Sequence, residues 1–240
     1  MIRRHLMAAA CVLAMGLTGA ARAQQAPAPE AAGPERFASA IDAFTEEDKV
    51  ALRPPCQIVF TGSSSVRFWK TLGEDLAPAP VLNRGFGGSQ VSDVDFYFDQ
   101  VVGRYRPRAI FFYAGDNDVH AGKSVDTVVA DFQQFMDLKT KALGDTPVYF
   151  ISLKPSKARI AEKPQQDAVN AKVKAMTAAR RDLTYVDIVP SMLDAAGQPK
   201  DIFIADGLHM TPEGYRLWTE VVRPVVEREM ARKSACAPAS

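Results

Sequence analysis

Residues 58–66 read IVFTGSSSV, so that a short apolar run passes directly into a glycine and three serines. Comparable runs follow, at 81–83, 109–113, 148–153 and 185–188. All are rich in β-branched or aromatic residues and lack clean apolar–polar alternation, as expected for strands covered on both faces. The first run, 58–61, therefore predicts a strand of a parallel sheet whose chain turns at once into the serines.

Amphipathic segments separate these runs. Apolar residues recur at helical spacing in each segment, in one case behind Ser124, a suitable helix cap. The last segment begins with Thr211 and Pro212, a cap followed by proline at the first helical position, and Pro224 is expected to kink or divide it. One helix is expected from 34 to about 52 and another from 211 to about 232. Apolar residues at helical spacing mark three more, without defining their ends, within 91–101, 125–136 and 169–176.

The alternation of strands and helices predicts an α/β fold, with helices on both faces of one parallel sheet. The 240 residues are 47% hydrophobic, which suits one well-filled core and is small for two. A single domain is expected over residues 35–240, preceded by segments outside the fold.

The first 23 residues have the pattern of a signal peptide. Arg3 and Arg4 precede an apolar run at 6–17, and the small residues of 21–23 predict cleavage before Gln24. The apolar run is short for a membrane span, although an anchor is the alternative. Residues 24–34, rich in Ala, Pro and Gln, are expected to be a flexible leader. The predicted location is periplasmic or secreted.

The charge of the mature chain gives no reason to expect a nucleic-acid partner. Removal of residues 1–23 leaves 26 basic against 28 acidic residues, and the basic residues form no run that would favour nucleic acid.

Cys56 and Cys236 remain in the mature chain, before the first strand and after the last helix. That helix should run antiparallel to the strand, so a disulfide is geometrically reasonable in an oxidising compartment, with two free thiols as the alternative.

Right-handed crossovers bring all strand-to-helix loops to one edge of such a sheet, where ligands bind. These loops hold a set of complementary groups. They contain the serines at 63–65, a glycine-rich turn at 83–89, Asn117 beside two aspartates, and Asp206 three residues before His209.

Each loop also has a structural explanation: a helix cap, a tight turn, or a polar turn. Together, however, they supply a hydroxyl nucleophile, a base, a carboxylate to orient the base, and neutral donors for an oxyanion. His120 competes with His209 as the base, but His209 is favoured because Asp206 is close in sequence. No set of ligands with metal-site spacing accompanies the aspartates, so neither a metal nor another cofactor is expected.

In this order, the four loops resemble the conserved blocks of the SGNH hydrolases, also called GDSL esterases and lipases. The resemblance covers residues 56–223, and Trp69 after the serine block is similar to the platelet-activating-factor acetylhydrolase-like branch. Ser63 stands where the family has aspartate. The resemblance implies a three-layer α/β/α sandwich, with a five-stranded parallel sheet in the flavodoxin-like order 2-1-3-4-5.

The resemblance also implies site residues. Ser64 is the expected nucleophile, with Asp206 and His209 completing a triad; the backbone N–H groups of Ser64 and Gly88 and the Asn117 amide would form the oxyanion hole. Outside the resemblance, Phe86 and Arg159 are candidates for substrate contact, with a core aromatic and a solvated charged loop as the alternatives.

The expected activity is hydrolysis of small-molecule, lipid or glycan esters, with short acyl groups favoured, through an acyl-enzyme. Two alternatives stay open: a cell-envelope polysaccharide O-acetyltransferase using the same acyl-enzyme, and a non-catalytic carbohydrate-binding protein. Neither acyl chain length nor oligomeric state can be derived from the sequence.

Overall fold

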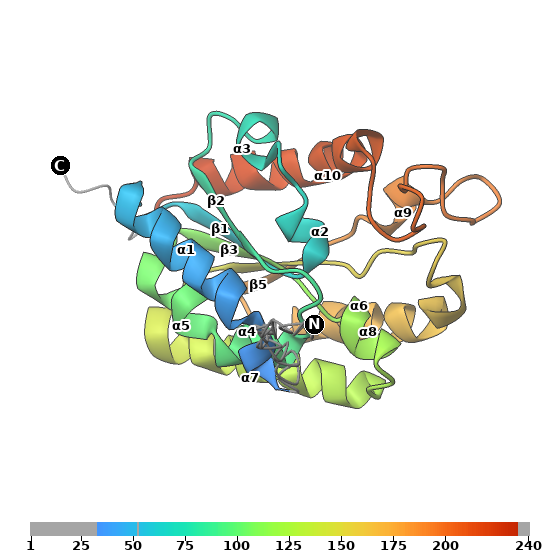
Figure 1. Ribbon diagram of the computed structural model, residues 1–240, viewed down its shortest axis with the longest axis horizontal. Helices are drawn as coiled ribbons and strands as arrows, with labels where there is room; N and C mark the ends of the chain where they lie inside the picture. Colours follow the sequence, from blue (N-terminus) through green and yellow to red (C-terminus); the bar gives the residue numbers. More distant parts are fainter. Residues whose placement is uncertain (1–32, 52, 235–240) are drawn as a thin grey trace, which may run out of the picture. The chain divides into compact units, whose positions relative to one another are not determined.

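Five parallel strands form one sheet in the order β2-β1-β3-β4-β5 (Figure 1). This computed structural model describes residues 33–51 and 53–234. The strands are β1 (Ile58–Gly62), β2 (Val81–Gly85), β3 (Ala109–Tyr113), β4 (Val148–Ile151) and β5 (Leu183–Val186). The predicted α/β class, parallel sheet and strand order are confirmed.

Helices cover both faces of the sheet (Figure 1). The α-helices are α1 (Ala38–Val50), α2 (Ser64–Arg67), α3 (Leu72–Asp75), α4 (Val91–Phe96), α5 (Phe98–Val101), α6 (Asp116–His120), α7 (Val125–Leu143), α8 (Lys163–Met176), α9 (Val189–Met192) and α10 (Pro212–Ala231). Short 3-10 turns lie at Pro34–Phe37, Gly103–Tyr105 and Ile160–Glu162.

Alternate residues of the strands belong to two separate hydrophobic cores, because successive side chains of a strand point to opposite faces of the sheet. On β3, Ile110 and Phe112 pack with α1, α4, α5, α7 and α8. Phe111 and Tyr113, between and after them, pack with α2, α3, α9 and α10. Both faces of every central strand are thus buried, which explains why the strands read as continuous apolar runs.

Only β3 has its predicted bounds: β1 ends at Gly62 rather than 61, and β2 ends at Gly85 rather than 83. β4 ends at Ile151 rather than 153, because the Asn170 side chain hydrogen-bonds both the N–H and the C=O of Leu153. β5 covers 183–186 rather than 185–188, because its pairing with β4 starts at Leu183. Beyond the end of β5, the Ile188 N–H donates to the Ser152 side-chain hydroxyl rather than to a strand carbonyl.

Three helix predictions also need correction. The N-terminal helix begins with a 3-10 turn and ends at Val50. The segment 91–101 is broken at Tyr97 into α4 and α5. α10 continues as one helix through Pro224, so of the two expected outcomes the division does not occur, and the kink remains a prediction. The Ser124 cap is confirmed, since its hydroxyl accepts from the Thr127 N–H at 3.1 Å.

The signal peptide and most of the leader lie outside the described residues, so these boundaries, and that of the domain at residue 35, remain predictions. Cys56 is disulfide-bonded. Its predicted partner, Cys236, also lies outside the described residues, and their pairing remains a prediction. None of the helices within 33–51 and 53–234 has the length and apolar character needed to cross a bilayer.

Candidate active site

The loop after β1 brings Ser64 to the carboxyl-terminal edge of the sheet. Gly62, the last residue of β1, has a φ of +122°, and a Cβ at this position would lie 1.9 Å from the Tyr113 carbonyl oxygen. Only glycine fits this close approach. The Ser63 N–H then donates to the same carbonyl at 2.8 Å, and Ser64 begins α2.

The His209 ring links Ser64 to Asp206. Its Nε2 lies 2.9 Å from the Ser64 Oγ, and its Nδ1 lies 2.6 Å from Asp206 Oδ2. An ionised carboxylate can only accept, so Nδ1 carries the proton and Nε2 is left to accept from the serine hydroxyl. The three residues predicted from the sequence therefore meet, although 145 positions separate the serine and the histidine.

Asp206 is held ionised by its own loop. Although burial raises the pKa of Asp206, hydrogen bonds from the His209 ring and from the backbone N–H groups of His209 and Leu208 lower it to about 2. Those backbone bonds to Oδ1 measure 2.9 and 2.8 Å. The carboxylate is therefore oriented from both sides, which fixes the imidazole in the tautomer described above.

At this edge, the backbone N–H groups of Ser64 and Gly88 have no protein acceptor in the described part of the chain. Gly88 adopts a φ of +83° in the turn after β2, a conformation that glycine takes without strain. Free N–H donors of this kind can accept a developing negative charge from an acyl group.

The Asn117 side chain is fixed by two hydrogen bonds. Its Nδ2 donates to the Ser89 carbonyl at 2.9 Å, and its Oδ1 accepts from Arg159 Nη2 at 3.0 Å. Because Nδ2 carries two hydrogens, one remains for a further acceptor. Asn117 lies in the first turn of α6, directly after β3, at the same edge as Ser64.

A model of the GDSL-like lipase/acylhydrolase family matches residues 58–217, which include all five residues of the predicted triad and oxyanion hole. The chain belongs to this GDSL-like family. The resemblance to SGNH hydrolases is thus confirmed, and membership supports ester hydrolysis as the activity. The narrower placement in the platelet-activating-factor acetylhydrolase-like branch remains a prediction.

Solved structures share the fold at low sequence identity. A chain from Streptococcus pneumoniae whose name refers to platelet activating factor has a TM-score of 0.70 and 19% identity, covering 79% of this chain and 92% of that one. A GDSL-like lipase from Bacteroides thetaiotaomicron has a TM-score of 0.65 and 18% identity, with coverage of 78% and 97%.

A carbohydrate esterase of family 3 from Talaromyces cellulolyticus has a TM-score of 0.58 and 16% identity, with coverage of 74% and 100%. No curated protein matches this GDSL-family chain.

A buried charged cluster lies behind Asn117. The Asp116 carboxylate is 3.4 Å from Arg159 Nη1 and 3.5 Å from Lys154 Nζ, and it accepts from the Tyr113 hydroxyl at 3.3 Å. Burial lowers the pKa of Lys154. The sequence singled out Arg159, but it did not indicate that the cluster lies beneath the oxyanion donor.

The two candidates for substrate contact lie behind the site. Phe86 is fully buried, packing against Phe37 and Tyr97 with ring centroids 5.1 and 6.2 Å away. Arg159 is only 8% exposed, with its guanidinium directed at Asn117 and Asp116. Such burial leaves little surface for a ligand, and substrate contact by either residue remains a prediction.

Two further polar residues near the site, Asp118 and His120, have structural partners. Asp118 is fully buried, accepts from the Val91 N–H at the start of α4 and pairs with Lys123 at 2.9 Å. His120, the competing base, is exposed and lies 2.7 Å from Glu162. His209, not His120, therefore reaches the serine.

A further aromatic residue, Phe68, borders the site. Phe68 is 40% exposed, and its ring lies edge-on to the His209 ring with centroids 4.9 Å apart. Phe68 lies directly after α2, which ends at Arg67.

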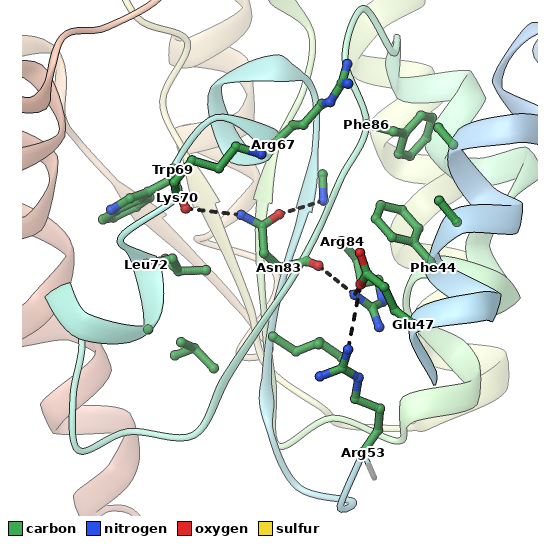
Figure 2. Close-up of a pocket in the computed structure, with 16 residues that line it drawn as sticks. Phe44, Glu47, Arg53, Arg67, Trp69, Lys70, Leu72, Asn83, Arg84 and Phe86 are labelled. Carbon is green, nitrogen blue, oxygen red and sulfur yellow. Dashed lines mark hydrogen bonds and ion pairs between the residues drawn. The ribbon is translucent and has the colours of Figure 1, made fainter. Parts of the chain in front are cut away.

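A cavity of about 500 Å³ lies beside β2, the edge strand, between α1 and α3 (Figure 2). Neither Ser64 nor His209 lines it. Figure 2 shows Arg67 and Lys70 toward one end, Arg53 at the other, and Asn83 between them. Arg67 belongs to the same short helix as Ser64, so the cavity adjoins the serine loop.

Proposed function

We propose that this chain is an exported serine esterase that hydrolyses carboxylic esters with short acyl groups through an acyl-enzyme. The observation that carries the proposal is the Ser64–His209–Asp206 relay, with contacts of 2.9 and 2.6 Å. A serine hydroxyl is a weak nucleophile until a base takes its proton, and this relay supplies an oriented base.

In the first half of the reaction, the Ser64 oxygen attacks the ester carbonyl while its proton passes to His209 Nε2. Negative charge develops on the carbonyl oxygen. The N–H groups of Ser64 and Gly88 and the remaining hydrogen of Asn117 Nδ2 would stabilise that charge. When the tetrahedral intermediate collapses, His209 returns the proton to the departing alcohol, which leaves an acyl group on Ser64.

In the second half, water takes the place of the alcohol. His209 removes a proton from the water as it attacks the acyl-enzyme, and the same donors hold the second oxyanion. Collapse releases the carboxylic acid and returns the proton to Ser64. Asp206 stays ionised throughout and stabilises the imidazolium that forms in both halves.

The test is a series of p-nitrophenyl esters of increasing acyl length, with wild type and Ser64→Ala. We expect kcat/KM to be highest for acetate or other short chains, and Ser64→Ala to lose more than the factor of about 10²–10³ that removing one oxyanion donor costs. Ser124→Ala, which changes a helix cap elsewhere, is the matched control. Undiminished turnover by Ser64→Ala would refute the proposal.

The acyl acceptor needs a separate measurement. Acetylated xylan and a lysophospholipid are suitable natural-type substrates, the first motivated by the carbohydrate esterase among the structural neighbours. We expect stoichiometric release of free acid. If added glycan instead captured the acyl group and suppressed free acetate, the chain would be an acyltransferase.

Export is supported by residues 1–23 alone, with Arg3 and Arg4 ahead of an apolar run and small residues before Gln24. Expression of the full chain with N-terminal sequencing of the product tests it. A mature protein beginning at Gln24 in the periplasm or medium is expected, and an unprocessed cytoplasmic chain would contradict it.

A further inference from the structure

We infer that Arg67 and Lys70 form a subsite for a negatively charged group, a carboxylate or a phosphate, on the alcohol part of the ester substrate. This inference rests on the proposed function, since it places the subsite relative to the Ser64 nucleophile. It names a substrate class: esters of acidic alcohols, rather than neutral ones.

The charge of the cavity beside β2 is unevenly distributed. Four basic side chains line it: Arg53, Arg67, Lys70 and Arg84. At one end, Arg84 pairs with Glu47 at 3.2 Å and with Asp48, and Arg53 pairs with the same two carboxylates. The dashed contacts in Figure 2 show how Glu47 bridges the two arginines. This end is therefore electrically compensated.

Positive charge at the other end is not compensated. Arg67 and Lys70 are exposed, and neither has an acidic partner among residues 33–51 and 53–234. Both cations lie near the same ring, at 5.4 and 5.9 Å from the Phe68 centroid. Two adjacent cations without a carboxylate partner attract an anion from solution.

These cations border the nucleophile. Arg67 is three residues after Ser64 on α2, and residues at this spacing share a helix face with Cβ atoms about 5–6 Å apart. A Cβ on Gly87 would lie 2.8 Å from Arg67 Nη1, so the absence of a side chain lets the guanidinium rest against the loop that carries Gly88. Phe68, between the two cations in sequence, contacts the His209 ring.

Chemistry favours an oxyanion ligand at this place. The planar guanidinium of Arg67 can donate two parallel hydrogen bonds to a carboxylate or phosphate, and the Lys70 ammonium adds a mobile point charge. Because both groups are exposed, their attraction is screened over a Debye length of about 10 Å at 0.1 M salt. The preference for anionic substrates should therefore weaken as salt is raised.

Three synthetic esters test the inference: 3-acetoxybenzamide, 3-acetoxybenzoate and 3-acetoxyphenyl phosphate. They carry the same acetyl group and differ in a neutral, carboxylate or phosphate substituent on the alcohol. At low salt we expect kcat/KM for at least one anionic ester to exceed that of the amide by on the order of tenfold. The ratio between the two anionic esters identifies the preferred group.

The decisive variant is Arg67→Gln/Lys70→Gln, which removes both charges and retains most of each side chain. It should bring the anionic-to-neutral ratio close to one while leaving hydrolysis of the amide largely intact. The matched control is Lys141→Gln/Arg181→Gln, which removes two exposed charges near the amino-terminal ends of β4 and β5. It should keep the wild-type ratio.

Equal kcat/KM for all three esters in wild type, or a preference that survives the double substitution, would overturn the subsite and leave the esterase proposal standing. Failure to hydrolyse any of the three, together with inactivity toward the p-nitrophenyl series, would instead overturn the proposed function.

Discussion

The Arg159 guanidinium donates a 3.0 Å hydrogen bond to Oδ1 of Asn117. This contact determines which end of the Asn117 amide faces the candidate oxyanion hole, because the oxygen is committed to the arginine and the nitrogen is left to donate. Arg159 is itself held by Asp116, at 3.4 Å. In the proposed mechanism, Arg159 is thus a positioning residue that acts through Asn117.

Coupling between these residues can be measured with a double-mutant cycle. Asn117→Ala should lower kcat on the order of 10²–10³-fold. Arg159→Ala should lower kcat more than it changes KM in wild type, yet cost little further in the Asn117→Ala background, because the residue that it positions is gone. Arg108→Ala, which removes an arginine bonded to the end of α10, is the control. Multiplicative losses in the double variant would contradict this role.

Asp206 is expected to matter for the tautomer of His209. Asp206→Asn retains the shape of the side chain but can present a donor to Nδ1, which favours the tautomer unable to accept the serine proton. The loss in kcat should be on the order of 10⁴. Steady-state kinetics at pH 8, with circular dichroism to verify folding, check it. A loss below tenfold would show that the carboxylate is dispensable.

Asp95, away from the site, should make stability depend on pH. Burial, together with the carboxylates of Asp131 and Asp118, raises the pKa of Asp95 from its ordinary value of 3.8 to about 8. Between these values the unfolded chain is ionised here and the folded chain is not, so folding must take up a proton. The native carboxyl therefore destabilises the fold increasingly as pH rises from about 4 to about 8.

Asp95→Asn removes that dependence. The variant should be more stable than wild type in urea denaturation, with an advantage that grows by up to about 1.4 kcal/mol per pH unit across this range and is small near pH 4. Asp99→Asn, a change at an exposed carboxylate, is the control. An advantage of the same size at pH 5 and pH 8 would contradict the assignment.

The sequence predicted the sheet well where burial alone defines a strand. β3 was placed at its observed bounds, 109–113, because all five of its residues are buried and apolar. The predicted boundaries are wrong where a long-range partner sets them. Asn170 terminates β4, and pairing with β4 shifts β5 by two residues. A local pattern carries no information about either contact.

For the site, four short motifs were enough to predict that Ser64, Asp206 and His209 lie together, because strand-end loops share one edge of a parallel sheet. The residues behind them could not be found in this way. Arg159 looked like a surface cation that could bind substrate, because its partners Asp116 and Asn117 lie in a distant segment of the chain. Phe86 is packed by Phe37 from the N-terminal segment, a contact that no local pattern indicates, while it also lines the cavity beside β2.

The identity of the nucleophile is tested most directly by covalent labelling. Full-length protein is treated with a fluorophosphonate, and the modified peptide is located by mass spectrometry. We predict a single adduct on Ser64, absent from Ser64→Ala and slowed strongly in His209→Ala, with Ser63 and Ser65 unmodified. A protein that remains unlabelled while active on esters, or an adduct on another residue, would contradict the account.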